Sequence, residues 1–211
     1  MSWTYLFVWG LTYLIGSIPF GWGIVWLTRG VDIRKEGTGN IEASNVTLVA
    51  GWFSGALVVL LDVFKGVSAI WLAGWMLGEG HTAWPVLAAG FLAILGHDFS
   101  FFLKGGGGKG IATLGGVLAV LDFRLYLLCL FLWLFFAFIV RVMVGSTLVV
   151  LFLLPFLMWF FFHDVSPVGF ALANLILALY RHQDNLHRMA RGEEPTLFGL
   201  SKFLSEKRLS R

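Results

Sequence analysis

The sequence predicts an all-α membrane protein that crosses the bilayer about seven times. Hydrophobic residues make up 58% of the 211 residues, charged residues only 13%, and the mean hydropathy is +0.84. A soluble domain carries about 25% charged residues. The hydrophobic residues also come in runs, separated by short polar segments. We therefore expect a single transmembrane helical bundle over residues 1–180, followed by a basic cytoplasmic tail over residues 181–211.

Breaks in hydropathy place the individual spans. They are residues 3–27, 46–77, 84–95, 111–121, 125–140, 146–162 and 167–180. The first contains Pro19 and ends near Arg29 without a small-residue cleavage site, so it is interpreted as a retained helix and not as a signal peptide. The third, fourth and seventh spans are short, which is typical of tilted or half-length helices around a polar cavity. Alternatively, the count of spans is off by one.

The basic residues predict the orientation of the bundle. Apart from Lys65 and Arg124, every lysine and arginine falls in one of four segments, residues 29–45, 97–110, 141–145 and 181–211. Loops rich in lysine and arginine face the cytoplasm. The N-terminus is therefore expected outside and the C-terminus inside, with some short or broken helices around a site on the cytoplasmic face.

A glycine-rich segment between the third and fourth spans is the first candidate site. Residues 96–113 set His97, Lys104 and Lys109 among consecutive glycines. Such backbone is tolerated at membrane depth only where it is buried in protein or lines a cavity. Its N–H groups and Lys109 suit an anion. The alternative is a flexible loop with basic anchors at the bilayer surface.

The loop before the second span is a second candidate. Gly37 and Gly39 permit backbone conformations closed to other residues. Hydrogen-bonding side chains accompany them, namely Thr38, Asn40, Ser44 and Asn45. Capping of the following helix would explain one such residue, but not four of them with two glycines between.

Two further groups of polar residues lie at or within spans. Asp62 and Lys65 share one helix face and can pair, as a structural pair or as part of a site. Near the end of the last span, helical spacing puts Arg181, Asn185 and Arg188 on one face, with His182 beside it. Such cations often anchor anionic lipid headgroups, but anchoring needs neither a histidine nor an asparagine.

Several common chemistries are excluded. Lys109 is followed by glycine and not by Ser or Thr, so the loop is no nucleotide-binding P-loop, and no Gly-x-Ser-x-Gly elbow occurs. The five histidines lack metalloprotease spacing, and a single cysteine, Cys129, allows neither a thiolate zinc site nor an internal disulfide. We expect no metal, no organic cofactor and no nucleic-acid partner. The sequence does not indicate a protein partner.

Taken in order, these motifs resemble one family, the bacterial integral-membrane acyl-phosphate glycerol-3-phosphate acyltransferases. The matching segments span nearly the whole chain: residues 16–21, 32–40, 43–46, 62–66, 96–97, 107–113 and 181–182 with 185. The resemblance implies a seven-helix bundle in the bacterial inner membrane, with its active site facing the cytoplasm. It also implies transfer of a fatty acyl group from acyl phosphate to the 1-hydroxyl of glycerol 3-phosphate, which gives lysophosphatidic acid and phosphate at the first step of phospholipid synthesis. The implied partners are these two substrates and the membrane lipids.

The resemblance and the charge of the substrates suggest roles for the motif residues. Acyl phosphate is an activated anhydride, so positioning and charge stabilisation suffice without a covalent intermediate. The expected catalytic residues are Thr38, Asn40, Lys109, His182 and Asn185. The expected substrate-binding residues are Arg34, Ser44, Asn45, His97, Lys104, Gly107, Gly108, Gly110, Thr113 and Arg181. Within this set, Lys109 and the glycine N–H groups bind one phosphate, Thr38, Asn40 and Asn45 bind the other reacting group, and Arg181, His182 and Asn185 orient glycerol 3-phosphate.

The chain departs from the family pattern at five positions. Thr38 stands for serine, Glu42 for glycine, Leu48 for arginine, Ser100 for proline and Gly106 for lysine. The changes at 48 and 106 remove two positive charges, and Glu42 adds a negative charge, near two bound phosphates. Two other interpretations therefore stay open: a diverged paralogue that serves as a lipid- or partner-binding membrane subunit, and a transporter of a small anion.

Overall fold

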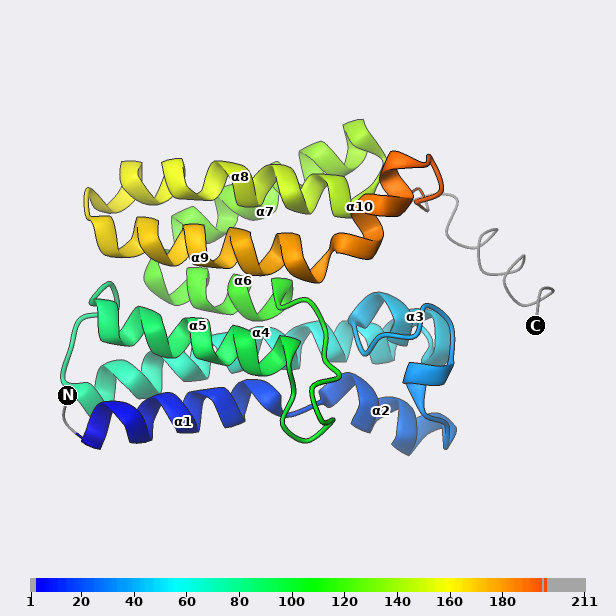
Figure 1. Ribbon diagram of the computed structural model, residues 1–211, viewed down its shortest axis with the longest axis horizontal. Helices are drawn as coiled ribbons and strands as arrows, with labels where there is room; N and C mark the ends of the chain where they lie inside the picture. Colours follow the sequence, from blue (N-terminus) through cyan, green and yellow to red (C-terminus); the bar gives the residue numbers. More distant parts are fainter. Residues whose placement is uncertain (1–2, 195, 197–211) are drawn as a thin grey trace. The chain divides into compact units, whose positions relative to one another are not determined.

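The computed structural model describes residues 3–194 and 196, and its regular elements over these residues are all helices (Figure 1). The all-α fold class is thereby confirmed. The described helices form two compact units, and the boundary between the units falls at Phe123 and Arg124. Residues 195 and 197–211, which make up much of the predicted basic tail, lie outside the described part.

The first unit is arranged around one long helix. Its elements are α1 (Trp3–Ser17), α2 (Phe20–Arg29), the 3-10 turn η1 (Ile33–Lys35), α3 (Ala43–Ala50), α4 (Trp52–Leu77), α5 (Trp84–Asp98) and α6 (Ile111–Leu121). The long helix α4 packs against α1, α3, α5 and α6, and α1 runs alongside α5 (Figure 1). The two candidate loops join α2 to α3 and α5 to α6.

Glycines allow α4 and α6 to approach closely. A side chain at Gly66 of α4 would collide with the carbonyl of Thr113, and one at Gly116 of α6 would collide with the carbonyl of Val63. Lipid gives helices little hydrophobic reason to associate, so small residues that permit close packing hold them together. This contact fixes the start of α6, which follows the glycine-rich loop, against the helix that carries Asp62 and Lys65.

The second unit consists of α7 (Phe123–Val140), α8 (Met143–Phe162), α9 (Val165–Arg181) and α10 (Gln183–Ala190). Helices α8 and α9 pack against each other. The indole nitrogen of Trp133 on α7 donates a hydrogen bond of 3.0 Å to the hydroxyl of Thr147 on α8. A buried histidine, His182, separates α9 from the polar helix α10.

All seven predicted hydrophobic segments form helices. Four helical segments are long and apolar enough to cross a bilayer: Trp3–Arg29, Trp52–Leu77, Phe123–Val140 and Met143–Phe162. The predicted short spans are confirmed as α5, α6 and α9. Large apolar side chains point outward along the helices, such as Trp75 on α4, which is 77% exposed. A surface of this kind suits a lipid environment, so the chain is a multi-pass membrane protein.

Two predicted spans were wrong in detail. The first is not one continuous helix, because Pro19 has no N–H to donate, and the chain breaks between Ser17 and Phe20. The second begins at Trp52 and not at residue 46. Gly51 has φ of +91°, a value that a helix cannot pass through, and it separates the short helix α3 from α4.

Candidate active site

The loop between α2 and α3 is organised by the fully buried side chain of Asn45. Its Oδ1 accepts the N–H of Thr38 at 2.8 Å. Its Nδ2 donates to three backbone carbonyls, those of Asn40 at 2.7 Å, Glu36 at 3.1 Å and Ile33 at 3.3 Å. Gly37, with φ of +55°, leaves the space in which Oδ1 lies. The amide of Asn45, expected to bind substrate, is thus engaged by the loop backbone.

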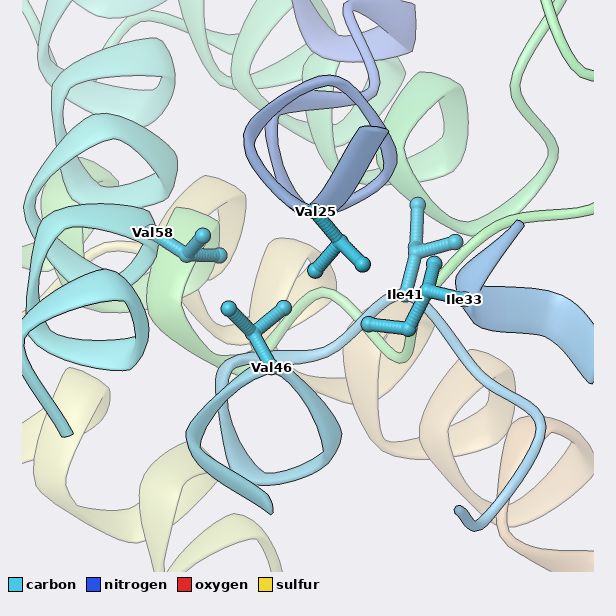
Figure 2. Packing of buried hydrophobic residues seen from close by; sticks show 5 residues of the cluster. All are labelled: Val25, Ile33, Ile41, Val46 and Val58. Carbon is cyan, nitrogen blue, oxygen red and sulfur yellow. The ribbon is translucent and has the colours of Figure 1, made fainter. Parts of the chain in front are cut away.

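An apolar cluster lies against this loop. Figure 2 shows its five side chains pointing toward one another from α2, η1, the loop, α3 and α4, namely Val25, Ile33, Ile41, Val46 and Val58. None of them is more than 4% exposed. Ile33 and Ile41 lie on either side of the loop's polar residues, so burial of these two side chains fixes both ends of the loop.

Two of the loop's polar groups differ in their surroundings. The Thr38 hydroxyl is buried and has no hydrogen-bond partner among the described residues. The Asn40 side chain accepts the N–H of Glu42 at 3.1 Å through Oδ1. Buried hydroxyls are usually hydrogen-bonded, and a bound ligand is one explanation for an exception. Ser44, also expected to bind substrate, is exposed on the first turn of α3.

The guanidinium of Arg34 is paired within the loop. Its Nη2 lies 2.6 Å from Oδ2 of Asp32, and its Nε lies 3.0 Å from Oδ1. These hydrogen bonds lower the pKa of Asp32 to about 2, and the same carboxylate raises the pKa of Arg34. Arg34 was expected to bind substrate, but in the structure its guanidinium is paired with the carboxylate of Asp32.

A backbone hydrogen bond joins the two ends of the glycine-rich loop. The N–H of Gly108 donates to the carbonyl of His97 at 3.0 Å, which joins the end of α5 to the residues just before α6. Gly110, in the left-handed region with φ of +71°, lets the chain turn into α6. Lys104 also has positive φ, and its side chain is exposed.

The two candidate loops meet at Lys109. Its Nζ lies 3.8 Å from Oε2 of Glu42, and the two side chains are 16% and 23% exposed. The structure thus brings the glycine-rich loop together with the loop that carries Thr38 and Asn40. It also sets the acidic departure from the family pattern beside the lysine that was expected to bind phosphate.

Three ionisable side chains are buried between α4 and α5. Nζ of Lys65 lies 2.8 Å from Oδ1 of Asp62, as the spacing along one helix predicts. Nδ1 of His97 lies 3.4 Å from Nζ of Lys65 and 3.5 Å from Oδ1 of Asp62. Thr113, at the start of α6, is also fully buried, and its hydroxyl has no hydrogen-bond partner among the described residues.

The predicted residues near the C-terminus belong to the second unit. Nδ1 of His182 lies 2.8 Å from the carbonyl of Ala178, so Nδ1 carries a proton and donates it. The buried Asn185 donates to Oε1 of Glu194 at 2.6 Å, and Nε of Arg188 lies 2.7 Å from Oε2 of the same carboxylate. Arg181 is half-buried at the end of α9.

Sequence reasoning missed two acidic residues beside these groups. Glu194 was not singled out, because nothing in the sequence shows that the chain turns back toward Asn185 after α10. Asp98 is fully buried at the end of α5, and its Oδ1 lies beside Gly110 at the start of α6. A carboxylate there is favoured by the positive end of the helix dipole. Its position at the boundary of a span, next to His97, was the available signal.

The described residues include no group of three His, Cys, Asp or Glu side chains that could hold a metal ion. That the reaction needs neither a metal nor an organic cofactor stays a prediction.

Comparisons with known proteins agree on one family. The family model described as glycerol-3-phosphate acyltransferase matches residues 6–192. A glycerol-3-phosphate acyltransferase of Thermosynechococcus vestitus is 36% identical over 194 residues, which cover 89% of this chain and 92% of the relative. One from Rhodopseudomonas palustris is 39% identical over 184 residues, which cover 87% and 91%.

Solved structures agree as well. The crystal structure of PlsY (YgiH), an integral membrane glycerol 3-phosphate acyltransferase, in its glycerol 3-phosphate form has a TM-score of 0.85 and 31% identity, covering 91% of this chain and 94% of that one. The lysophosphatidic acid form has a TM-score of 0.84 and 30% identity, covering 93% and 97%. This chain therefore belongs to the glycerol-3-phosphate acyltransferase family.

Proposed function

We propose that this protein transfers a fatty acyl group from acyl phosphate to the 1-hydroxyl of glycerol 3-phosphate, giving lysophosphatidic acid and phosphate. Membership of the family supports the reaction, and the related crystal structures are of the glycerol 3-phosphate and lysophosphatidic acid forms, its acceptor and its product. The observation in this chain that supports the proposal most directly is that Lys109 of the glycine-rich loop contacts Glu42 of the loop that contains Thr38.

The reaction needs binding and charge stabilisation more than a nucleophilic side chain. The 1-hydroxyl oxygen attacks the acyl carbon, the bond from that carbon to the bridging oxygen breaks, and phosphate leaves with the electron pair. The departing phosphate accepts the proton of the attacking hydroxyl, so no side chain is needed as a base. Lys109, with the N–H groups of Gly107 and Gly110, holds the phosphate and stabilises the charge that it gains. The N–H of Gly108, which was expected to join them, donates to the carbonyl of His97 instead.

The hydroxyl of Thr38 is suited to the other side of the reacting centre. It is buried, it lacks a protein partner among the described residues, and Asn45 holds the backbone that carries it. A donor held in this way can bind the acyl carbonyl oxygen as negative charge develops on it. Asn45 then serves as a positioning residue, and Asn40, two residues after Thr38 in the same loop, is proposed to contribute to the same centre.

Arg181, His182 and Asn185 are proposed to orient glycerol 3-phosphate. Nδ1 of His182 donates to the carbonyl of Ala178, which sets the orientation of the ring. In this proposal the ring contacts a substrate hydroxyl through Nε2, and Arg181 pairs with the acceptor's phosphate.

The diverged paralogue is the second candidate, because Glu42 lies beside Lys109 and offers that lysine an internal anion. One assay separates the two candidates. Purified protein in lipidic medium receives palmitoyl phosphate with or without glycerol 3-phosphate, and both phosphate release and lysophosphatidic acid are measured. The enzyme releases phosphate and forms lysophosphatidic acid in equal amounts, and only when glycerol 3-phosphate is present. Folded protein that forms no lysophosphatidic acid would favour the paralogue.

We further propose that the protein lies in the bacterial inner membrane with this site facing the cytoplasm. The basic segments on one side support that orientation, since both candidate loops fall within them. Acyl phosphate and the membrane lipids would then reach the site through the bilayer, and glycerol 3-phosphate from the cytoplasm.

A further inference from the structure

Two side-chain hydrogen bonds join α1 to the turn that begins the glycine-rich loop. The hydroxyl of Tyr13 donates to the carbonyl of Phe99 at 2.7 Å, and the hydroxyl of Ser100 donates to the carbonyl of Ser17 at 2.5 Å. Phe99 and Ser100 directly follow α5, so both bonds lie where that helix ends and the loop begins. The start of the loop is therefore attached to α1, 86 and 83 residues earlier in the chain.

Helix α1 is a firm point of attachment, because its backbone lies directly against that of α5. A side chain at Gly16 of α1 would collide with the carbonyl of Ala93, and one at Gly96 of α5 would collide with the carbonyl of Tyr13. Small residues let helix backbones approach and pack tightly in this way. Helix α1 can therefore hold the residues that follow α5 in one place.

The end of α5 is in turn the surface against which the glycine-rich loop lies. A side chain at Gly107 would collide with the carbonyls of His97 and Asp98. The N–H of Gly108 donates to the carbonyl of His97 at 3.0 Å. These two glycines directly precede Lys109, whose Nζ is proposed to bind phosphate. The position of Lys109 therefore depends on the last turn of α5.

We propose that Tyr13 and Ser100 are positioning residues, which keep the end of α5 and the glycine-rich loop in the arrangement that binds the phosphate of acyl phosphate. The inference deepens the proposed acyl transfer and rests on it. Both residues act through the loop and not on the substrate, because each hydroxyl already donates to a backbone carbonyl. Their loss lowers the fraction of molecules whose loop is ready to bind, and the apparent affinity falls with that fraction.

Tyr13→Phe removes one hydroxyl and keeps the ring, so it tests the first hydrogen bond alone. KM for palmitoyl phosphate should rise about three- to ten-fold, the effect of one neutral hydrogen bond, while kcat stays within about two-fold. KM for glycerol 3-phosphate should not change, because its proposed ligands, Arg181, His182 and Asn185, belong to the second unit. A merely structural role would instead lower the amount of folded enzyme, which reduces kcat and leaves both KM values unchanged.

Hydrogen exchange measures the state of the loop without any reaction. In mixed micelles, mass spectrometry should show amide exchange over residues 99–110 about three- to ten-fold faster in Tyr13→Phe than in the wild type, because the loop opens more often. Tyr5→Phe is the matched control, since it makes the same substitution on α1 where the Tyr5 and Trp9 rings lie 6.2 Å apart. It should change neither the exchange nor either KM.

Ser100→Ala removes the second hydrogen bond and should cause the same changes. It takes the place of Tyr13→Phe if that variant does not fold. Unchanged exchange over residues 99–110 would overturn the inference, and so would a fall in kcat with both KM values unchanged or an equal rise of both KM values.

The two proposals can fail separately. Faster exchange in Tyr13→Phe, in a protein that forms no lysophosphatidic acid, would support the positioning role and contradict the proposed reaction. Formation of lysophosphatidic acid with unchanged exchange in Tyr13→Phe would support the reaction and contradict the positioning role.

Discussion

At the scale of single residues, the carboxylate of Glu42 competes with the substrate phosphate for Lys109. Its carboxylate lies 3.8 Å from Nζ of Lys109, where the phosphate of a substrate is proposed to bind. Both side chains are partly exposed, so the pair is weak compared with a hydrogen-bonded phosphate. A substrate can therefore displace Glu42, which reconciles the acidic departure from the family pattern with an active enzyme.

Replacing Glu42 tests that competition. Glu42→Gln should lower KM for palmitoyl phosphate about two- to five-fold, since a partly exposed ion pair contributes roughly 0.2 to 1 kcal/mol. Glu36→Gln removes the same charge from an exposed position of the same loop and should leave KM unchanged. An unchanged or higher KM in Glu42→Gln would mean that the carboxylate helps the site.

Asn45 is expected to act through the loop and not through the substrate. Asn45→Ala removes the acceptor of the Thr38 N–H and the donor to three carbonyls. The free energy of unfolding in mixed micelles should fall by about 2 to 4 kcal/mol, since buried groups are left without partners. Ser44→Ala, on the exposed face of the same turn, should change it by less than about 0.5 kcal/mol. Equal effects in the two variants would contradict this role.

The sequence identified most of these residues but not their partners. Thr38, Asn40 and Lys109 were predicted from residue type and spacing, and the structure brings their two loops together. Asn45 was predicted as a ligand, because spacing cannot show that backbone carbonyls 5, 9 and 12 residues earlier turn toward its amide. For the same reason the pairing of Glu194 with Asn185 could not be predicted.

At the scale of elements, a side-chain hydrogen bond connects the break in the first span with the start of the glycine-rich loop. Pro19 ends α1, and the carbonyl of Ser17, left without its helical partner, accepts the Ser100 hydroxyl at 2.5 Å. Ser100 is 1% exposed and begins the turn that leads into the glycine-rich loop. The hydrogen bond therefore ties the helix break to the loop of the site. Proline, which the family pattern has at this position, has no hydroxyl to donate.

Ser100→Ala should lower the free energy of unfolding by about 1 to 3 kcal/mol, since it leaves a buried carbonyl unsatisfied. Ser146→Ala is the matched control. Its hydroxyl donates to the carbonyl of Val142, but that carbonyl also accepts the N–H of Ser146, so the loss should be smaller. Denaturant titration in mixed micelles measures both variants. A loss at Ser100 no larger than at Ser146 would contradict the role of this hydrogen bond.

Hydropathy predicted the existence of each element better than its ends. Averaging over about 20 residues finds an apolar segment but not one residue that breaks it. Pro19 and Gly51 lie in apolar surroundings, so the spans across them were predicted as continuous although the backbone turns at both. The fourth span, residues 111–121, coincides with α6 because glycine precedes it and Asp122 follows it.

At the scale of the whole molecule, the seven apolar segments and the uneven distribution of basic residues predict the path through the membrane. Single-cysteine labelling tests that path. In a Cys129→Ala background, Gly80→Cys lies in a turn predicted outside and Glu36→Cys in a loop predicted inside, and both positions are exposed. An impermeant maleimide should label position 80 in intact spheroplasts and position 36 only after permeabilisation. The reverse pattern would contradict the orientation and the cytoplasmic site.

The central claim is that Lys109 holds the phosphate from which the acyl group is transferred. The most direct measurement is the glycerol 3-phosphate-dependent release of phosphate from palmitoyl phosphate by Lys109→Ala, beside Arg29→Ala, which removes one positive charge from the exposed end of α2. We predict that Lys109→Ala loses activity by about a hundred-fold or more while it stays folded, and that Arg29→Ala keeps wild-type activity. Near-normal turnover in folded Lys109→Ala would contradict the account.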